Sequence, residues 1–321
     1  MSTPNPADEA RHAPDPAEPL WNESYYLDWF AEDLSVGGYV RIGFYPNLNK
    51  VWYWACVVGP DRPLVTVIEH DIEMPSSASS LEVRADGLWA DHVVETPNEH
   101  MSINLEAFGL QLDDPSDVYT SDPSGTRVPF GFELDFHTDR GAYQWPPVTP
   151  RYEIPCKVEG FVLVGSERIE VDGWGQRDHS WGAARDWWTN QWCWNEARLD
   201  DGTRFHSAGG FLPGYDWGVA YRLDPDATEF VEGDSVRLDV TEGDERLPTR
   251  TGVGILGADL EFEPLAFSPV LLVHPDGRVA RFPRAMARVT DTTTGRIGGG
   301  WIEWNQPPTG TRLPPNDVVP E

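Results

Sequence analysis

Residues that could carry chemistry are concentrated in one segment, residues 173–196. These 24 residues contain two Arg-Asp pairs, one His and six of the chain's fifteen Trp. A buried Trp needs a partner for its indole N–H, and charged residues are seldom buried unless they are paired. A segment that combines both so densely is typical of the wall of an apolar cavity that contains a few polar groups.

Asp178 is the candidate general acid of this segment. Successive side chains of a strand point to opposite faces, so Asp178 and Ser180 are expected on one face and Arg177, His179 and Trp181 on the other. Burial in an apolar pocket favours the protonated form of a carboxyl group, which is the form that a general acid requires. Aromatic faces nearby stabilise a developing carbocation. This combination suits protonation of an alkene, followed by attack of water or of an internal nucleophile.

The other residues of the segment are expected to support Asp178. We expect His179 to be its proton-transfer partner, and Arg177 and Asp186 to orient the pair. The indoles expected to line the cavity belong to Trp181, Trp187, Trp188 and Trp194. The residue types alone also allow a structural alternative, in which both Arg-Asp pairs are ion pairs that lock the connection between two domains and the Trp side chains pack the seam.

Further candidate binding residues lie on either side of this segment. His206 belongs to a predicted hairpin over residues 192–209 with a short Asp-Gly turn, where it would pair across strands with Trp194, Asn195 or Glu196. A second aromatic-rich region contains Tyr26, Tyr45 and Trp54, which would line a pocket or pack in the core. No HExxH, His-x-His or facial-triad spacing and no Gly-rich phosphate loop is present, so neither a metal nor another cofactor is expected.

The charge balance restricts the class of ligand. The chain has 53 acidic and 24 basic residues, a net charge of −29. Such a field repels nucleic acid and anionic membranes, so we expect a hydrophobic small-molecule substrate, no nucleic acid and no stable membrane insertion. No apolar run is long enough for a membrane-spanning helix and no signal peptide follows Met1, which predicts a cytoplasmic protein. The oligomeric state is not indicated.

The cysteines argue against a disulfide framework or a structural zinc site. There are only three, Cys56, Cys156 and Cys193, and none forms a CxxC pair. We expect them to be small buried hydrophobic residues in a reducing compartment.

Short β patterns bounded by turn residues occupy most of the chain. Residues 38–45 alternate, residues 50–58 are aromatic and β-branched, and residues 152–171 are typical of a hairpin around Gly165-Ser166. Many short strands at such spacing predict an all-β protein of the sandwich or barrel class. The length on each side of the Trp-rich segment suffices for one ligand-holding barrel.

Composition predicts where the domains of the chain begin and end. Residues 1–20 are rich in Pro, Ala, Asp and Glu and are predicted to be a disordered leader, and residues 306–321 a disordered tail. Between them we predict an N-terminal β-domain over residues 21–172 and a C-terminal β-domain over residues 173–305.

The motif Gly-x-Gly-x-Arg-Asp-His-Ser-Trp-Gly-x-x-Arg-Asp-Trp at residues 173–187 resembles that of the carotenoid 1,2-hydratase (hydroxyneurosporene synthase) and AttH-like superfamily, in its actinobacterial and proteobacterial branch. Residues 21–26 and 37–54 resemble the same group. The resemblance implies two lipocalin-like antiparallel β-barrel or sandwich domains packed side by side, with a ligand cavity and cofactor-independent chemistry. It also implies that Asp178 matches the acid by which the hydratases protonate an isolated alkene.

The sequence and the resemblance together predict a hydratase or dehydratase (a hydro-lyase), or a cyclase-type isomerase. Its substrate would be an alkene of a hydrophobic, isoprenoid or steroid-like molecule, and the strongly acidic chain favours a smaller ligand over a long polyene. Two alternatives stay open. In the first, the protein is a non-catalytic lipocalin-like carrier of an apolar metabolite and Asp178 is structural. In the second it is a pericyclase, whose pocket merely folds a reactive substrate.

Overall fold

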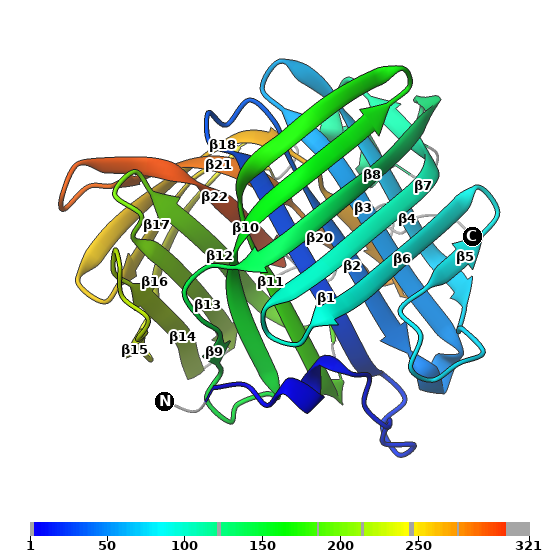
Figure 1. The fold of residues 1–321 in the computed structure, drawn as a ribbon, viewed down its shortest axis with the longest axis horizontal. Helices are drawn as coiled ribbons and strands as arrows, with labels where there is room; N and C mark the ends of the chain where they lie inside the picture. The colour runs from blue at the N-terminus through cyan, green and yellow to red at the C-terminus, as the bar shows by residue number, and fades with distance from the viewer. Residues whose placement is uncertain are drawn as a thin grey trace. The chain divides into compact units, whose positions relative to one another are not determined.

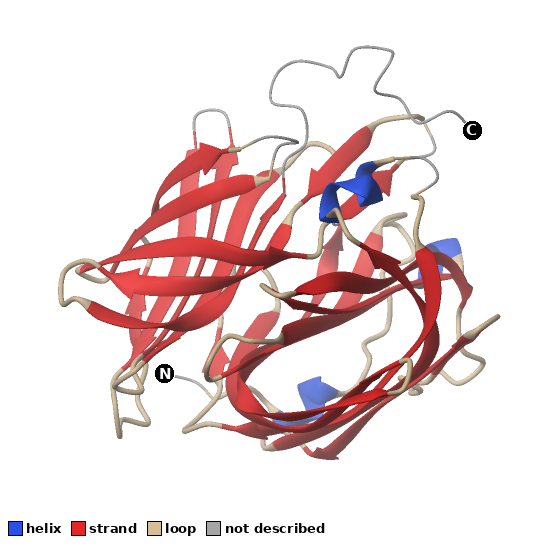
Figure 2. Ribbon diagram, turned by 90° about the horizontal axis from the view of Figure 1, so that it is seen from above, coloured by secondary structure: helices blue, strands red, loops and turns tan. Residues whose placement is uncertain are grey.

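The computed structural model describes residues 3–120, 123–184, 186–212, 215–243, 247–274 and 276–305. Most of these residues are in strands, and their only helices are three short 3-10 turns, η1 (Pro6–Glu9), η2 (Pro46–Leu48) and η3 (Pro115–Tyr119) (Figure 2). The predicted all-β class is therefore confirmed. The chain divides into two compact units, the first formed by Met1–Val57, Val65–Gln111 and Thr126–Arg185, and the second by Val58–Leu64, Leu112–Gly125 and Asp186–Glu321.

The first unit contains an antiparallel sheet of eleven strands. Their order is β4-β3-β2-β1-β11-β10-β8-β7-β6-β5, with β9 paired to β10, and β4 also pairs with β7, so the sheet curves round on itself (Figure 1). The strands are β1 (Trp21–Ala31), β2 (Gly37–Tyr45), β3 (Lys50–Gly59), β4 (Arg62–Glu73), β5 (Val83–Ala85), β6 (Leu88–Thr96), β7 (His100–Leu112), β8 (Thr126–Thr138), β9 (Tyr143–Gln144), β10 (Arg151–Val164) and β11 (Glu167–Ala184).

The second unit contains a nine-stranded antiparallel sheet and a separate two-stranded one, β19-β20. The order in the large sheet is β15-β14-β13-β12-β22-β21-β18-β17-β16. The strands are β12 (Gln191–Leu199), β13 (Arg204–Leu212), β14 (Tyr215–Leu223), β15 (Val231–Gly233), β16 (Arg237–Glu242), β17 (Pro248–Ile255), β18 (Ala258–Phe267), β19 (Val270–Val273), β20 (Val279–Phe282), β21 (Arg284–Asp291) and β22 (Arg296–Asn305).

The central strands of the first sheet are buried on both faces. In β3, Val51, Tyr53 and Val57 belong to the apolar core, while Trp54 points to the opposite face and is equally inaccessible. β1 and β2 are buried along almost their whole length. Buried polar groups need hydrogen-bond partners. Both faces of β11 carry several buried polar side chains, so β11 contains the candidate site.

Two features differ from the domain prediction. Residues 3–20, predicted as a disordered leader, have defined structure, with Glu9 of η1 only 3% exposed. The predicted boundary at residue 173 falls inside β11, whereas the division between the units lies between Arg185 and Asp186. The predicted tail over residues 306–321 lies outside the described residues.

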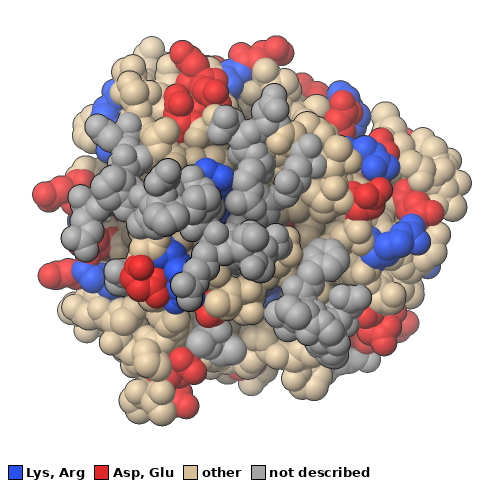
Figure 3. Space-filling view, turned by 180° about the vertical axis from the view of Figure 1, so that it is seen from behind, with Lys and Arg blue, Asp and Glu red and all other residues tan. Residues whose placement is uncertain are grey.

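Other expectations from composition can be compared with the structure. All three cysteines are buried and free, as predicted. On the face shown in Figure 3, acidic and basic side chains are interspersed. The part of the chain that the structure describes has no helix with the length and apolar character needed to span a bilayer.

A buried histidine makes the stability of the first unit sensitive to acid. His92 on β6 is 3% exposed, neither ring nitrogen has a hydrogen-bond partner among the described residues, and burial lowers its pKa to about 3. Between that pH and the ordinary value of 6.5, only the unfolded chain binds this proton. As the pH is lowered through this range, this group should therefore reduce the free energy of unfolding by roughly 1.4 kcal/mol per pH unit.

We expect His92→Phe to reduce the slope of unfolding free energy against pH between pH 4 and 6. Urea denaturation at three pH values measures that slope. The matched control is the same change at the exposed His137, which should leave the slope at the parent value. An unchanged slope in His92→Phe would show that the buried ring is not responsible.

Candidate active site

β11 positions the motif residues between two neighbouring strands. It pairs with β1 on one side and β10 on the other, so that Asp178 lies opposite Tyr26 and Glu153, and His179 lies opposite Tyr25 and Tyr152. Side chains alternate between the two faces of a strand. The contacts follow this alternation and divide Arg177, Asp178 and His179 between two separate polar clusters.

Asp178 belongs to a chain of charged and polar groups on one face. Its Oδ2 accepts a hydrogen bond of 2.6 Å from Nη2 of Arg151, whose Nε donates to Oε1 of Glu153 at 2.6 Å. The other oxygen of Glu153 accepts from Nε2 of Gln176 at 2.8 Å. Asp178 is 6% exposed and Glu153 is fully buried. Two buried carboxylates thus share one guanidinium, a more polar setting for Asp178 than the apolar pocket predicted from the sequence.

Aromatic side chains lie on the same face as Asp178, on the adjoining strands. Across β1 and β2, Tyr26 pairs with Arg41. The guanidinium of Arg41 lies 4.7 Å from the ring centroid of Trp54, and Nε1 of Trp54 donates to Nε2 of His70 at 2.7 Å. Burial and the charge of Arg41 lower the pKa of His70 to about 3. The ring is therefore neutral at physiological pH, as a hydrogen-bond acceptor at Nε2 must be.

Three of the predicted binding residues fall on this face. These are Tyr26, Tyr45 and Trp54. The ring centroid of Tyr45 is 4.5 Å from that of Trp52. Trp52 in turn lies 6.3 Å from Trp54. We call Tyr26, Tyr45, Trp52 and Trp54, which share the face of Asp178, the aromatic platform; of these, Tyr26 lies directly opposite Asp178 on the adjoining strand.

Arg177 lies on the opposite face of β11 and binds a residue of the N-terminal segment. Its Nη2 and Nη1 donate to Oε1 and Oε2 of Glu9 at 2.8 and 3.1 Å. Glu9 also accepts from the hydroxyl of Tyr152 at 2.7 Å and from the backbone N–H of Asn98 at 2.8 Å. Burial alone would raise the pKa of Glu9, but the charge and hydrogen bonds of Arg177, with those of Tyr152 and Asn98, lower it. Arg177 is therefore an ion-pair partner of Glu9.

His179 lies on the same face as Arg177. Its Nδ1 is 2.8 Å from the carbonyl oxygen of Asp8, and its Nε2 is 3.0 Å from Oε1 of Glu23. The same oxygen of Glu23 lies 2.8 Å from Nδ1 of His12, and His12 stacks on Trp181 with a centroid distance of 4.0 Å. The predicted pairing of His179 with Asp178 is thus not formed, because neighbouring residues of a strand point to opposite faces.

Asp186 belongs to the second unit, as do Trp187, Trp188 and Trp194. Oδ1 of Asp186 accepts from the backbone N–H of Trp188 at 3.0 Å, the geometry of a turn cap. The indole of Trp188 donates to the carbonyl of Leu272 at 3.0 Å, and Trp187 is 1% exposed. Each of these side chains therefore has a structural role within that unit.

The predicted hairpin over residues 192–209 is confirmed as β12 and β13, with Glu196 opposite His206. Nδ1 of His206 donates to the carbonyl of Asn195 at 3.0 Å, and its ring centroid lies 5.4 Å from that of Trp194. The amide of Asn195 pairs with Ser207 at 2.8 Å. The structure brings Trp194, Glu196 and His206 together as a polar and aromatic group in the second unit, apart from the two clusters on β11, and places the side chain of Asn195 against Ser207.

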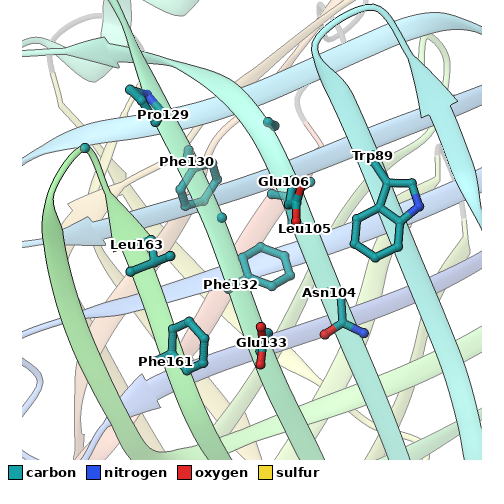
Figure 4. A pocket seen from close by; sticks show the side chains of 13 residues that line it. Trp89, Asn104, Leu105, Glu106, Pro129, Phe130, Phe132, Glu133, Phe161 and Leu163 are labelled. Carbon is teal, nitrogen blue, oxygen red and sulfur yellow. The ribbon is translucent and has the colours of Figure 1, made fainter.

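A separate hollow lies on the outer side of β6, β7, β8 and β10. It encloses about 420 Å³ and is lined by Trp89, Phe161 and Leu163 with Asn104 and Glu106 (Figure 4). None of the predicted site residues contributes to it. It therefore does not replace the Asp178 face as the candidate site.

Sequence reasoning missed several members of both clusters. Arg151, Glu153, Arg41 and His70 carry no local motif, and strand pairing alone brings them to the face of Asp178. Glu9 lies 168 residues from its partner Arg177 in a segment whose composition indicated disorder. One pattern in the sequence could have indicated these residues. Polar residues at every second position of an aromatic-rich strand are typical of a strand with a buried polar face.

Comparisons with known proteins identify the family and the fold. A family model described as "Domain of unknown function (DUF7064)" matches residues 5–308. No curated protein matches the chain. An AttH-like protein from Nitrosomonas europaea is 14% identical with a TM-score of 0.60, covering 89% of this chain and 92% of that one.

Two further solved structures are similar. Kievitone hydratase from Nectria haematococca is 13% identical with a TM-score of 0.58, covering 95% of this chain and 96% of that one. CghA with Sch210972 is 13% identical with a TM-score of 0.56, covering 90% and 89%. At such identities the likeness shows the fold alone. It confirms the two-sheet β fold that the resemblance implied, while the AttH-like and carotenoid-hydratase assignments both stay predictions.

Proposed function

We propose that this chain, which belongs to the DUF7064 family, is a cofactor-independent acid–base enzyme of the hydratase or cyclase type. Its substrate would be an alkene of a hydrophobic, isoprenoid or steroid-like small molecule. The observation that carries the proposal is the position of the buried Asp178 on the same face as the aromatic platform. A proton donor and cation-stabilising rings are the two parts that protonation of an alkene requires.

The proposed reaction begins with transfer of the Asp178 proton to one alkene carbon. The π electrons form the new C–H bond and leave a carbocation at the other carbon, beside the rings of the aromatic platform. In hydration, the oxygen of water adds to that cation and its proton returns to the Asp178 carboxylate. In cyclisation, an internal alkene or hydroxyl group replaces water as the nucleophile, and the carboxylate again takes up the released proton.

Arg151 and Glu153 are positioning residues in this proposal. The guanidinium of Arg151 stabilises the Asp178 carboxylate that remains after proton transfer, through the 2.6 Å hydrogen bond. Glu153 binds the same guanidinium, so the positive charge of Arg151 is shared between two carboxylates and does not serve Asp178 alone.

The similar structures support the reaction class without specifying a substrate. Kievitone hydratase shares the fold over nearly the whole of both chains, so kievitone is a reasonable first substrate to test. The net charge of −29 favours a small terpenoid, steroid or polyketide-like ligand over a membrane-borne polyene. The three free, buried cysteines support the proposal of a cytoplasmic protein, since that compartment is reducing.

The function is tested by incubating the purified chain with kievitone and a panel of isoprenoid and steroid alkenes in ¹⁸O-labelled water. A hydratase yields a product that has gained one water with the heavy oxygen, and a cyclase yields an isomer of unchanged mass. Mass spectrometry with chromatography separates these outcomes. Binding of every panel member without consumption would contradict the proposal and support the carrier.

A further inference from the structure

Three possible metal-binding atoms converge on the face of β11 that the proposed reaction does not use. Oε1 of Glu23 lies 2.8 Å from Nδ1 of His12 and 3.0 Å from Nε2 of His179. One ligand atom from each of the three residues lies within 4.8 Å of the others. Glu23 and His179 are fully buried, and His12 is half-buried.

The hydrogen bond on the far side of the His179 ring determines which nitrogen carries its proton. Nδ1 is 2.8 Å from the carbonyl oxygen of Asp8, which can only accept, so Nδ1 bears the hydrogen. In the neutral ring, Nε2 then directs its lone pair at Oε1 of Glu23, which is also an acceptor. Two facing acceptors require a cation between them, either a proton or a metal ion.

The same oxygen faces both histidines, so a single metal ion would satisfy all three groups at once. The Nδ1–H of His179 bonded to a backbone carbonyl is the arrangement that orients metal-binding histidines in known sites. Two imidazoles and one carboxylate are a Zn²⁺ ligand set that leaves a fourth position open. We propose that His12, Glu23 and His179 bind one divalent transition-metal ion, with Zn²⁺ the favoured occupant.

This site would attach the N-terminal segment to the sheet. His12 belongs to that segment, whereas Glu23 lies on β1 and His179 on β11. The backbone N–H of His12 also donates to Oε1 of Glu23 at 2.9 Å, so the N-terminal segment is already held where the metal would bind. Sequence spacing could not reveal the set, because His179 lies 156 residues from Glu23.

The test is calorimetric titration of Zn²⁺ into the full-length chain after chelator treatment, with Co²⁺ as a spectroscopic substitute. We expect one ion per chain and visible Co²⁺ absorption typical of low coordination number. Residues that only orient a ligand change metal affinity by about 10–100-fold. Loss of a ligand in His12→Asn should therefore weaken Zn²⁺ binding by at least about 100-fold and abolish the Co²⁺ bands.

The matched control is the double change His100→Asn with His137→Asn. These rings also stack, at 4.2 Å, beside the carboxylate of Asp135, so the control removes a histidine pair elsewhere in the same unit. It should bind as the parent does. Absence of stoichiometric binding, equal binding by His12→Asn, or equal weakening in the control would overturn the proposal. Because Asp178 lies on the other face of β11, this outcome is independent of the alkene assay.

Discussion

Asp178→Asn is expected to lower kcat on the alkene substrate by about 10²–10⁴-fold, the contribution typical of a general acid. The amide matches the carboxyl group in shape, and its oxygen still accepts from Nη2 of Arg151, but it cannot deliver a proton. KM should change little, since the lost interaction operates in the transition state. Steady-state kinetics on the substrate found in the panel measures both parameters.

Asp172→Asn is the control for that variant. Asp172 lies on the same strand, forms an ion pair with Lys157 and is 80% exposed, so its substitution removes one carboxylate from β11 without touching the network. It should retain parental turnover. If Asp178→Asn turns over as fast as Asp172→Asn, Asp178 is not the acid. If instead Asp178→Asn binds substrate poorly or unfolds at a lower urea concentration than the parent, the Asp178 carboxylate is a structural partner of Arg151.

Glu9→Ala is expected to give the largest loss of stability. Removal of one partner of a buried ion pair leaves the other charge uncompensated and costs about 3–5 kcal/mol. Here the remaining charge is Arg177, 2% exposed, and the hydroxyl of Tyr152 loses its acceptor as well. Urea denaturation at neutral pH measures the free energy of unfolding.

Two further variants make the stability result specific. Glu32→Ala removes an exposed carboxylate and should stay within about 0.5 kcal/mol of the parent. Glu9→Leu combined with Arg177→Met removes both charges and should recover much of the loss, because apolar replacement of a buried pair is often neutral. Equal stability of Glu9→Ala and Glu32→Ala would mean that residues 3–12 do not stabilise the fold.

Local patterns in the sequence predicted the strands well because their causes are local. Alternation predicted that Asp178 and His179 point to opposite faces, and the Asp-Gly turn predicted the β12–β13 hairpin. Of the three partners expected for His206, namely Trp194, Asn195 and Glu196, the structure places Glu196 opposite it. Gly165-Ser166 likewise marked the turn between β10 and β11, where Val164 pairs with Glu167. Turn chemistry and a two-residue period act over a few residues and can be read directly.

Partners brought together by the fold could not be read in this way. The defined structure of residues 3–12 depends on contacts with distant strands. Glu9 forms an ion pair with Arg177. Asp8 contacts His179 and His12 contacts Glu23, and composition does not encode such contacts. Arg151 reaches Asp178 only through the pairing of β10 with β11. Sequence reasoning therefore assigned Asp178 to the correct face of its strand. It misassigned His179 as the partner of Asp178, although alternation already placed the two on opposite faces.

Proton transfer from Asp178 to an alkene carbon is the central claim, and NMR of the product formed in D₂O tests it most directly. Exchange loads the Asp178 carboxyl group with deuterium before each turnover. The account predicts one non-exchangeable deuterium on the carbon that receives the proton, formed by the parent and by Asp172→Asn but not by Asp178→Asn. A product without deuterium at that carbon would contradict the account and indicate a pericyclic reaction.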